Sequence, residues 1–388
     1  MVKKSGGGTL KLVALSFAGI LVACQTTSRS TPNAPYYSAQ ITKNGKLQCF
    51  TEEFMNAQEK PPRCEISAVE TIDGQLVFGS DKDIPNASSI FSYTSSTASP
   101  QGLPQNYFNH PKILNATKFE AMAKISDESI ILVSTAFDRT RPGGDWDKFN
   151  NLVAWRMQDP ATVQIIQSQH RSDATSSVEL REVFRKALKQ ADYPLGPPYF
   201  KIEGMTYLPG GTILFGIRET GARYDDFNFH RWIIAGKLKG AFPALTLDPN
   251  LETILDFSNH KIPDITEPLG ISSLAFDPVR DGVWILTSYE TEATDEGVGG
   301  YLWFISLDKL LSRSQGAPTL IRTPQGAPLH FAHKSEGLTV LRDGRLFVVH
   351  DDDRVTGRTD IKDPSRQFSR RLNESFYSVV EISTSSSK

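Results

Sequence analysis

Residues 202–219 read IEGMTYLPGGTILFGIRE, and residues 335–353 read SEGLTVLRDGRLFVVHDDD. Each segment holds two short apolar runs joined by a turn that contains glycine, which is the strongest short-range signal for a β-hairpin. In both segments the turn lies seven residues after the glutamate, and charged residues follow the second run. The chain therefore carries a repeated hairpin that ends in charge, and such a repeat is a better guide to the architecture than any single motif.

Three weaker copies have the same order of strand, turn, strand and charged end, at residues 66–83, 119–139 and 271–290. A third run of strand character follows every copy, and a fourth often follows the third. Four antiparallel strands per repeat are typical of a β-propeller blade. The chain is therefore predicted to be an all-β propeller of four-stranded blades, with the third strands at residues 89–93, 152–156, 232–238, 301–307 and 376–382.

The number of repeats predicts five blades, with six as the alternative. The repeat anchors are residues 66, 120, 203, 272 and 336, and the widest gap between them holds one predicted inserted helix. Ser176 and Glu179 have the spacing of a capping box, the apolar residues between Leu180 and Leu188 fall on one face, and Pro194 lies beyond the end. Residues 38–50 are expected to supply the missing outer strand of the last blade and so to close the ring.

The first 23 residues have the pattern of a signal peptide, with Lys3 and Lys4 ahead of an apolar run that is too short to span a bilayer. The run ends in Leu-Val-Ala-Cys, which resembles the bacterial lipobox. Cys24 is therefore predicted to be acylated and to anchor the protein to a lipid membrane, with an ordinary cleaved signal peptide as the alternative. Gln25 follows, and by the sorting rule of enterobacterial lipoproteins this indicates the outer membrane. Residues 24–38 are predicted to be a flexible tether and residues 39–388 a single propeller domain.

Cysteine content and net charge indicate the cellular compartment and the kind of partner. Besides Cys24 the chain has two cysteines, Cys49 and Cys64, and an even remainder in an oxidising compartment predicts one disulfide. Two buried free thiols are the alternative. Without residues 1–23 the net charge is −5, so nothing indicates a nucleic-acid partner. We expect the mature protein to be a monomer in the cell envelope.

Charged residues are predicted to gather on one face of the propeller. In a blade the first strand is innermost and antiparallel to the second, so the start of one and the end of the other lie at the same end of the central channel. Long polar loops follow the second strands, and such loops on a rigid scaffold commonly bind ligands. The alternative is that these charges are merely solvated, or that the repeated glutamates form salt bridges with neighbouring blades. The candidates are Asp81, Lys82, Glu120, Asp138, Arg139, Glu203, Arg218, Glu219, Ser288, Glu290, Lys334, Glu336, Asp351, Asp352 and Asp353.

The mixture of charges suggests two sub-sites. Carboxylate oxygens are the ligands that Ca²⁺ or Mg²⁺ prefers, and the predicted metal ligands are Glu203, Glu336, Asp351, Asp352 and Asp353. Basic residues suit a phosphate or carboxylate, and the predicted binders of a small anionic substrate are Lys82, Arg139, Arg218 and Lys334. Glu203, Glu336 and Arg218 are the predicted catalytic residues. His330, His333 and His350 are close in sequence, but exposed loop histidines are the preferred interpretation over a metal site.

At these residues the chain resembles phytase-like and related uncharacterised secreted bacterial propellers, which carry comparable Glu-Gly-aliphatic strand starts and terminal acidic runs. The resemblance covers most of residues 64–383. It implies calcium-assisted attack of water on a phosphate ester, with acidic residues binding metal and basic residues binding phosphate. Two hypotheses follow: a divalent-metal-dependent hydrolase of phosphate esters, or a non-enzymatic propeller that binds a glycan, a peptide or an envelope protein through the same charged face.

Overall fold

The computed structural model describes residues 36–52, 54–55, 59–94, 99–140, 146–291, 297–313, 316–352, 357–358 and 367–385. The predicted signal peptide, Cys24 and Asp353 lie outside the described residues. The described part of the chain has no helix that is long and apolar enough to cross a membrane.

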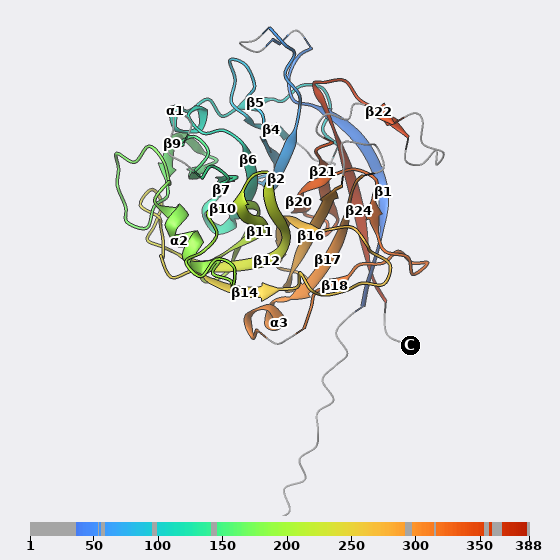
Figure 1. Cartoon of the computed structure of the whole chain (residues 1–388). Helices are drawn as coiled ribbons and strands as arrows, with labels where there is room; N and C mark the ends of the chain where they lie inside the picture. The colour runs from blue at the N-terminus through green and yellow to red at the C-terminus, as the bar shows by residue number, and fades with distance from the viewer. Residues whose placement is uncertain are drawn as a thin grey trace, which may run out of the picture.

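Five antiparallel sheets surround one axis (Figure 1). Their innermost strands are β2, β6, β10, β15 and β20, and each contacts the next until β20 contacts β2. The ring is therefore closed and has five blades, which confirms the predicted fold and excludes the six-bladed alternative.

The blades keep the strand order that the repeats predict. The first blade contains β2 (Ile66–Ile72), β3 (Gln75–Ser80), β4 (Ile90–Thr94) and β5 (Asn106–Tyr107), and the second contains β6 (Phe119–Ile125), β7 (Ile130–Thr135), β8 (Leu152–Arg156) and β9 (Asp159–Ile165). The third contains β10 (Tyr199–Leu208), β11 (Thr212–Arg223), β12 (Asp226–Lys239), β13 (Thr246–Leu247) and β14 (Glu252–Asp256). The fourth contains β15 (Gly270–Asp277), β16 (Gly282–Glu290), β17 (Val298–Ser306), β18 (Thr319–Leu320) and β19 (His330–Phe331).

The fifth blade joins the two ends of the described chain. It contains β20 (Ser335–Val340), β21 (Leu346–His350), β24 (Glu374–Ser385) and, as its outer strand, β1 (Tyr36–Gln48), which pairs with β24 from Tyr36 opposite Ser385 to Gln48 opposite Glu374. The expected closure by residues 38–50 is confirmed. β1 begins at Tyr36, ahead of the predicted domain start at residue 39. The ring of Tyr37, the next residue, packs against Trp284 and Phe304 of the fourth blade. A small ribbon of β22 (Gly357–Arg358) and β23 (Phe368–Ser369) lies beside this blade.

Short helices occupy the connections: α1 (Pro111–Leu114), α2 (Leu180–Ala187) and α3 (Leu307–Leu311), with a 3₁₀ turn at Ser126–Glu128. The inserted helix is confirmed as α2, and its apolar face is buried, with Phe184 against Phe137, Phe200 and Phe215.

The predicted capping box of α2 is wrong, because both of its members bind elsewhere. Ser176 donates its hydroxyl to Asp147 at 3.0 Å, and the carboxylate of Glu179 accepts from the backbone N–H and the hydroxyl of Ser168 at 2.7 and 2.8 Å. Neither side chain bonds the first turn of α2, which begins at Leu180 without a side-chain cap.

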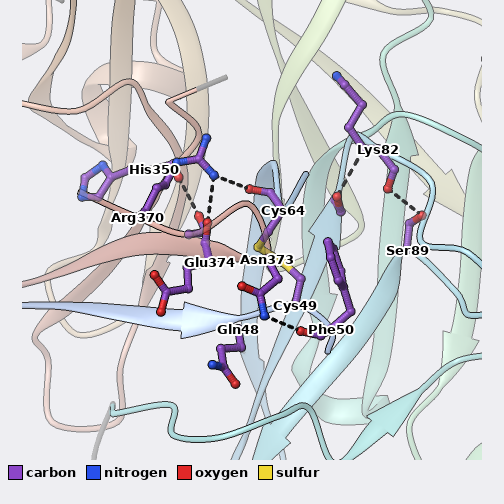
Figure 2. The surroundings of a disulfide bond; sticks show 12 residues. Gln48, Cys49, Phe50, Cys64, Lys82, Ser89, His350, Arg370, Asn373 and Glu374 are labelled. Atoms are coloured by element: carbon purple, nitrogen blue, oxygen red, sulfur yellow. Dashed lines mark hydrogen bonds between the residues drawn. A yellow bond between two sulfur atoms is a disulfide. The ribbon is translucent and has the colours of Figure 1, made fainter. Parts of the chain in front are cut away.

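The disulfide between Cys49 and Cys64 is also confirmed (Figure 2). It links the segment after β1 to the residues before β2, next to the last strand of the fifth blade. Arg370 donates to the carbonyl oxygens of Cys64 and Glu374 at 3.2 and 2.8 Å, and Asn373 donates to the carbonyl of Phe50 at 2.8 Å. The disulfide therefore lies where the first and last blades meet.

Candidate functional site

Every innermost strand contains a β-bulge at the same position. The pairing of each first strand with its second strand skips one residue, and that residue is buried, with 1–2% of its surface exposed. A bulge re-aims a side chain and is common beside functional sites. Because the five inner strands encircle the axis, the bulges place five polar side chains around the central channel: Ser67, Glu120, Glu203, Ser272 and Glu336. The anchor predicted at Ile66 is therefore one residue early, whereas the other four anchors coincide with bulges.

Lysines lie two residues before three of these bulges and pair with the buried glutamates. Lys201 Nζ lies 3.2 Å from an oxygen of Glu120, which belongs to the preceding blade, and also pairs with Glu203 of its own strand. Lys334 Nζ lies 2.8 Å from Glu336. Lys118 Nζ is 2.5 Å from Asp138 and 3.8 Å from Glu120. The channel therefore holds a network of alternating charges that connects neighbouring blades, as one of the alternatives from the sequence anticipated.

Arg218 joins the third blade to the fourth. Its side chain is 2% exposed, and its guanidinium lies 3.1 Å from Glu203 and 3.3 Å from Glu219. It also donates to the hydroxyl of Ser288 at 2.5 Å and lies over the ring of Phe229, 5.1 Å from its centroid. These four contacts fix the guanidinium plane, which matters because arginine recognises phosphate and carboxylate through that plane.

The three glutamates of the channel differ in protonation. Burial, reinforced by Glu203 and Glu336 and opposed by Lys201 and Lys118, raises the pKa of Glu120 to about 8. Burial likewise raises the pKa of Glu203, although Arg218 and Lys201 oppose it. For Glu336 burial also acts upward, but Lys334, Lys201 and Arg218 together outweigh it and lower the pKa to about 2. At neutral pH the channel therefore holds a neutral Glu120 beside an ionised Glu336.

An acidic cluster lies between the fifth and first blades. Among the described residues, one group of three potential metal ligands has its oxygens within 4.8 Å of one another: Glu65, Asp81 and Asp351. Burial, together with the charge of Glu65, raises the pKa of Asp351 well above its usual range. Lys82 Nζ lies 2.6 Å from Glu65 and 2.8 Å from Asp81. The oxygen donors suit Ca²⁺ or Mg²⁺, provided that the ammonium group of Lys82 moves aside.

A cavity of about 290 Å³ opens at the mouth of the channel. Three of its lining residues are the cations Lys201, Arg218 and Lys334, and the others are Glu219, Phe227, Phe229, Glu290 and Thr291. Lys201 and Lys334 are 12% and 11% exposed at their side chains, so the cations are held in the wall rather than in solvent. The cavity thus combines fixed positive charge with aromatic surface.

The residues predicted from the sequence divide into those that meet here and those that do not. Glu203, Glu336, Arg218 and Lys334 converge at the channel. Lys82 lies in the acidic cluster instead, and Arg139 is 44% exposed, pairs with Asp138 at 3.4 Å and does not line the cavity.

The acidic run after β21 does not act as one unit. Asp351 belongs to the cluster with Glu65, while Asp352 accepts from the backbone N–H of Lys334 at 3.1 Å and lies 2.7 Å from Nδ1 of His333. Asp353 lies outside the described residues, so the full metal-ligand set stays a prediction. The interpretation of the histidines as exposed loop residues is wrong. His350 is 2% exposed in β21 and lies against Ser335 and Ser378, and His330 lies in β19 against Tyr289.

Lys118, Lys201 and Glu65 were missed by sequence reasoning. A signal for the two lysines exists, because Lys-x-Glu occurs at residues 118–120, 201–203 and 334–336, in three of the five copies. Glu65 gives no such signal, because the first copy has a serine at its bulge and a glutamate where three of the other copies have lysine.

Comparison with known proteins adds little to this picture. No family model matches the chain, and no curated protein matches it. Solved structures that are similar include a luciferin-regenerating enzyme (11% identity over 89% of this chain and 95% of that one, TM-score 0.36), Pseudomonas fluorescens PhoX in complex with vanadate (11%, 89% and 75%, TM-score 0.38) and a β-1,3-galactosidase with galactodeoxynojirimycin (10%, 85% and 93%, TM-score 0.42).

Identities and TM-scores this low transfer no activity, and the strand pairing itself establishes the fold. The chain is a five-bladed β-propeller with a charged channel mouth. Membership of a phytase-like family stays a prediction.

Proposed function

We propose that this protein is a propeller that binds a small anionic molecule at the mouth of its channel. The observation that carries the proposal is the convergence of Lys201, Arg218 and Lys334 on one cavity. These cations already have carboxylate partners, but burial raises the pKa of Glu120 to about 8, which weakens the negative charge opposite Lys201 and leaves that cation better able to accept an anion. A phosphate or carboxylate group would meet a guanidinium whose plane is fixed beforehand, which reduces the entropy cost of binding.

The cellular setting belongs to the same proposal. We take the mature protein to be a monomer tethered through acylated Cys24 to a membrane of the cell envelope, with the outer membrane favoured by Gln25. Mass spectrometry of the membrane fraction tests this point, because a Cys24 that carries acyl chains is expected at the mature N-terminus. A mature chain that begins elsewhere or lacks acyl chains would contradict it.

Binding of inorganic phosphate and acetate, measured by isothermal titration calorimetry, tests the central claim. Arg218→Lys keeps the charge but loses the planar fork and should weaken binding about tenfold, the cost of roughly one charged hydrogen bond. The matched control is Arg139→Lys, since that arginine is a neighbouring cation outside the cavity lining. Circular dichroism establishes that both variants fold. No measurable anion binding, or an equal loss in the two variants, would refute the proposal.

A second candidate function is a divalent-metal-dependent hydrolysis of phosphate esters, favoured by the proximity of Glu65, Asp81 and Asp351. These three residues would hold Ca²⁺ or Mg²⁺, which would supply Lewis acidity and a water of lowered pKa. Arg218 and Lys334 would orient the ester, and the ionised Glu336 and the neutral Glu120 could accept and donate protons nearby.

Turnover of a panel of phosphate and carboxyl esters with added Ca²⁺ or Mg²⁺ decides between the two functions. Hydrolysis that needs the metal and is lost in Asp351→Asn would support the enzyme. If no ester is hydrolysed and calcium does not bind, while phosphate still binds, the non-enzymatic function remains.

A further inference from the structure

The cavity owes its shape to a departure from five-fold symmetry in the fourth blade. Two residues before the bulge, the other blades have charged side chains: Glu65, Lys118, Lys201 and Lys334. The fourth blade has Gly270 at this position. A Cβ there would lie 2.5 Å from Cγ of Arg218 and 3.0 Å from a ring carbon of Phe229, so both side chains lie over this glycine.

Small residues continue through the same blade. Its bulge residue is Ser272, where three other blades have glutamate, and Ser288 stands opposite Gly270. Within the described residues the hydroxyl oxygen of Ser272 has no hydrogen-bond partner. The small residues of the fourth blade therefore leave room into which Arg218 and Phe229 fit, and these two side chains form the cavity wall together with Glu290 and Thr291 from the end of its second strand.

An extended hairpin supplies the opposite wall. β11 has 12 residues, whereas the second strands of the other blades have 5–9. The additional length continues the hairpin beyond the ring, where Phe227 pairs with Gly221 and Phe229 pairs with Glu219. Side chains two residues apart on a strand point to the same face, so the two rings form one aromatic surface. Their centroids are 5.3 Å apart in an edge-to-face contact, and Phe227 also lies 5.9 Å from Tyr199.

We infer that the ligand is an anionic group carried on a flat ring, such as an aryl phosphate or aryl carboxylate. The inference rests on the proposed anion binding and adds a second recognition element to it. The anionic group would lie against Arg218 and Lys334, and the ring would pack on Phe227, which is partly exposed. A cavity of about 290 Å³ is at the small end of ligand sites and admits one ring with its substituent.

Matched ligands separate the two elements of recognition. We would measure the dissociation constants of phenyl phosphate, methyl phosphate and inorganic phosphate by calorimetry at pH 7. The phenyl compound should bind about tenfold more tightly than the methyl compound, because its ring buries more apolar area and also gains an aromatic contact with Phe227. In Phe227→Leu this ratio should fall to about threefold or less, since leucine stays apolar but offers no ring face.

The control is Tyr224→Leu, an aromatic replacement on the same hairpin at a residue that is 69% exposed and outside the cavity lining. It should keep the wild-type ratio. Saturation-transfer NMR on the wild-type protein with an equimolar mixture of phenyl and methyl phosphate covers the case in which Phe227→Leu does not fold. Transfer to the phenyl protons should be stronger than transfer to the methyl protons, and equal transfer would count against the aromatic contact.

The outcomes are distinguishable. Equal binding of phenyl and methyl phosphate, or an unaltered ratio in folded Phe227→Leu, would overturn the aromatic inference and leave anion binding intact. If none of the three phosphates binds, the proposed function fails as well.

Discussion

Glu120 should control part of the pH dependence of stability, and Glu120→Gln tests this. The folded protein raises the pKa of this carboxyl from 4.5 to about 8, chiefly by burial. Between these two pH values the folded state keeps a proton that the unfolded chain releases. The resulting contribution to the free energy of unfolding is fully present below about pH 4.5 and is lost as the pH rises through 8.

The size of the effect follows from the shift. At about 1.4 kcal/mol per pH unit, the wild-type protein should lose on the order of 4 kcal/mol between pH 5 and pH 8 through this residue. Glutamine resembles the protonated carboxyl and does not titrate. The free energy of unfolding of Glu120→Gln should therefore fall less over the same range. The stability of the variant relative to the wild type should increase as the pH rises.

Guanidinium unfolding curves followed by tryptophan fluorescence at several pH values measure this difference. The matched control is Glu336→Gln, because the pKa of Glu336 is lowered to about 2 and its contribution is lost only as the pH falls toward that value. This variant should be destabilised at both pH 5 and pH 8. It should still lose stability over that range, although less than the wild type, because the charge of Glu336 is one of the groups that raise the pKa of Glu120. If the wild type and Glu120→Gln change in parallel across this range, Glu120 is ionised in the folded state and the reasoning is wrong.

Two further predictions concern the disulfide and the fourth blade. Replacing Cys49 and Cys64 together by serine should lower the free energy of unfolding by roughly 3 kcal/mol, as expected for a 15-residue separation. Dithiothreitol should lower the melting temperature of the wild type but not that of the variant. Sensitivity of the variant to the reductant would contradict the prediction. Gly270→Ala places a Cβ 2.5 Å from Cγ of Arg218 and should weaken phosphate binding about tenfold with little change in overall secondary structure. Calorimetry checks this, and unchanged affinity would mean that Arg218 can move without loss.

The sequence predicts the fold well because the evidence for it is local. A turn such as Asp343-Gly344 between two apolar runs specifies a hairpin without reference to the rest of the chain. The capping box at Ser176 fails for the converse reason: Asp147 competes for its hydroxyl, and that contact is set by tertiary structure.

The site is only partly predictable, because some of its contacts are set by tertiary structure rather than by the repeats. Glu203, Glu336, Arg218 and Lys334 follow from the repeats and meet as expected. The Glu65 cluster depends on how the fifth blade meets the first, and the cavity depends on an absent side chain at Gly270. Neither feature belongs to the repeated pattern, so the repeats could not show it.

The sharing of the fifth blade between both ends of the chain has a consequence for biosynthesis. β1 leaves the ribosome before the other described strands, while β24, the strand beside it in this sheet, follows all of them. Until then the nascent chain carries an unpaired strand edge, which is a template for aggregation. Four blades can form as their hairpins emerge, but the ring cannot close before β24 has emerged, so the protein depends on whatever keeps β1 soluble until then.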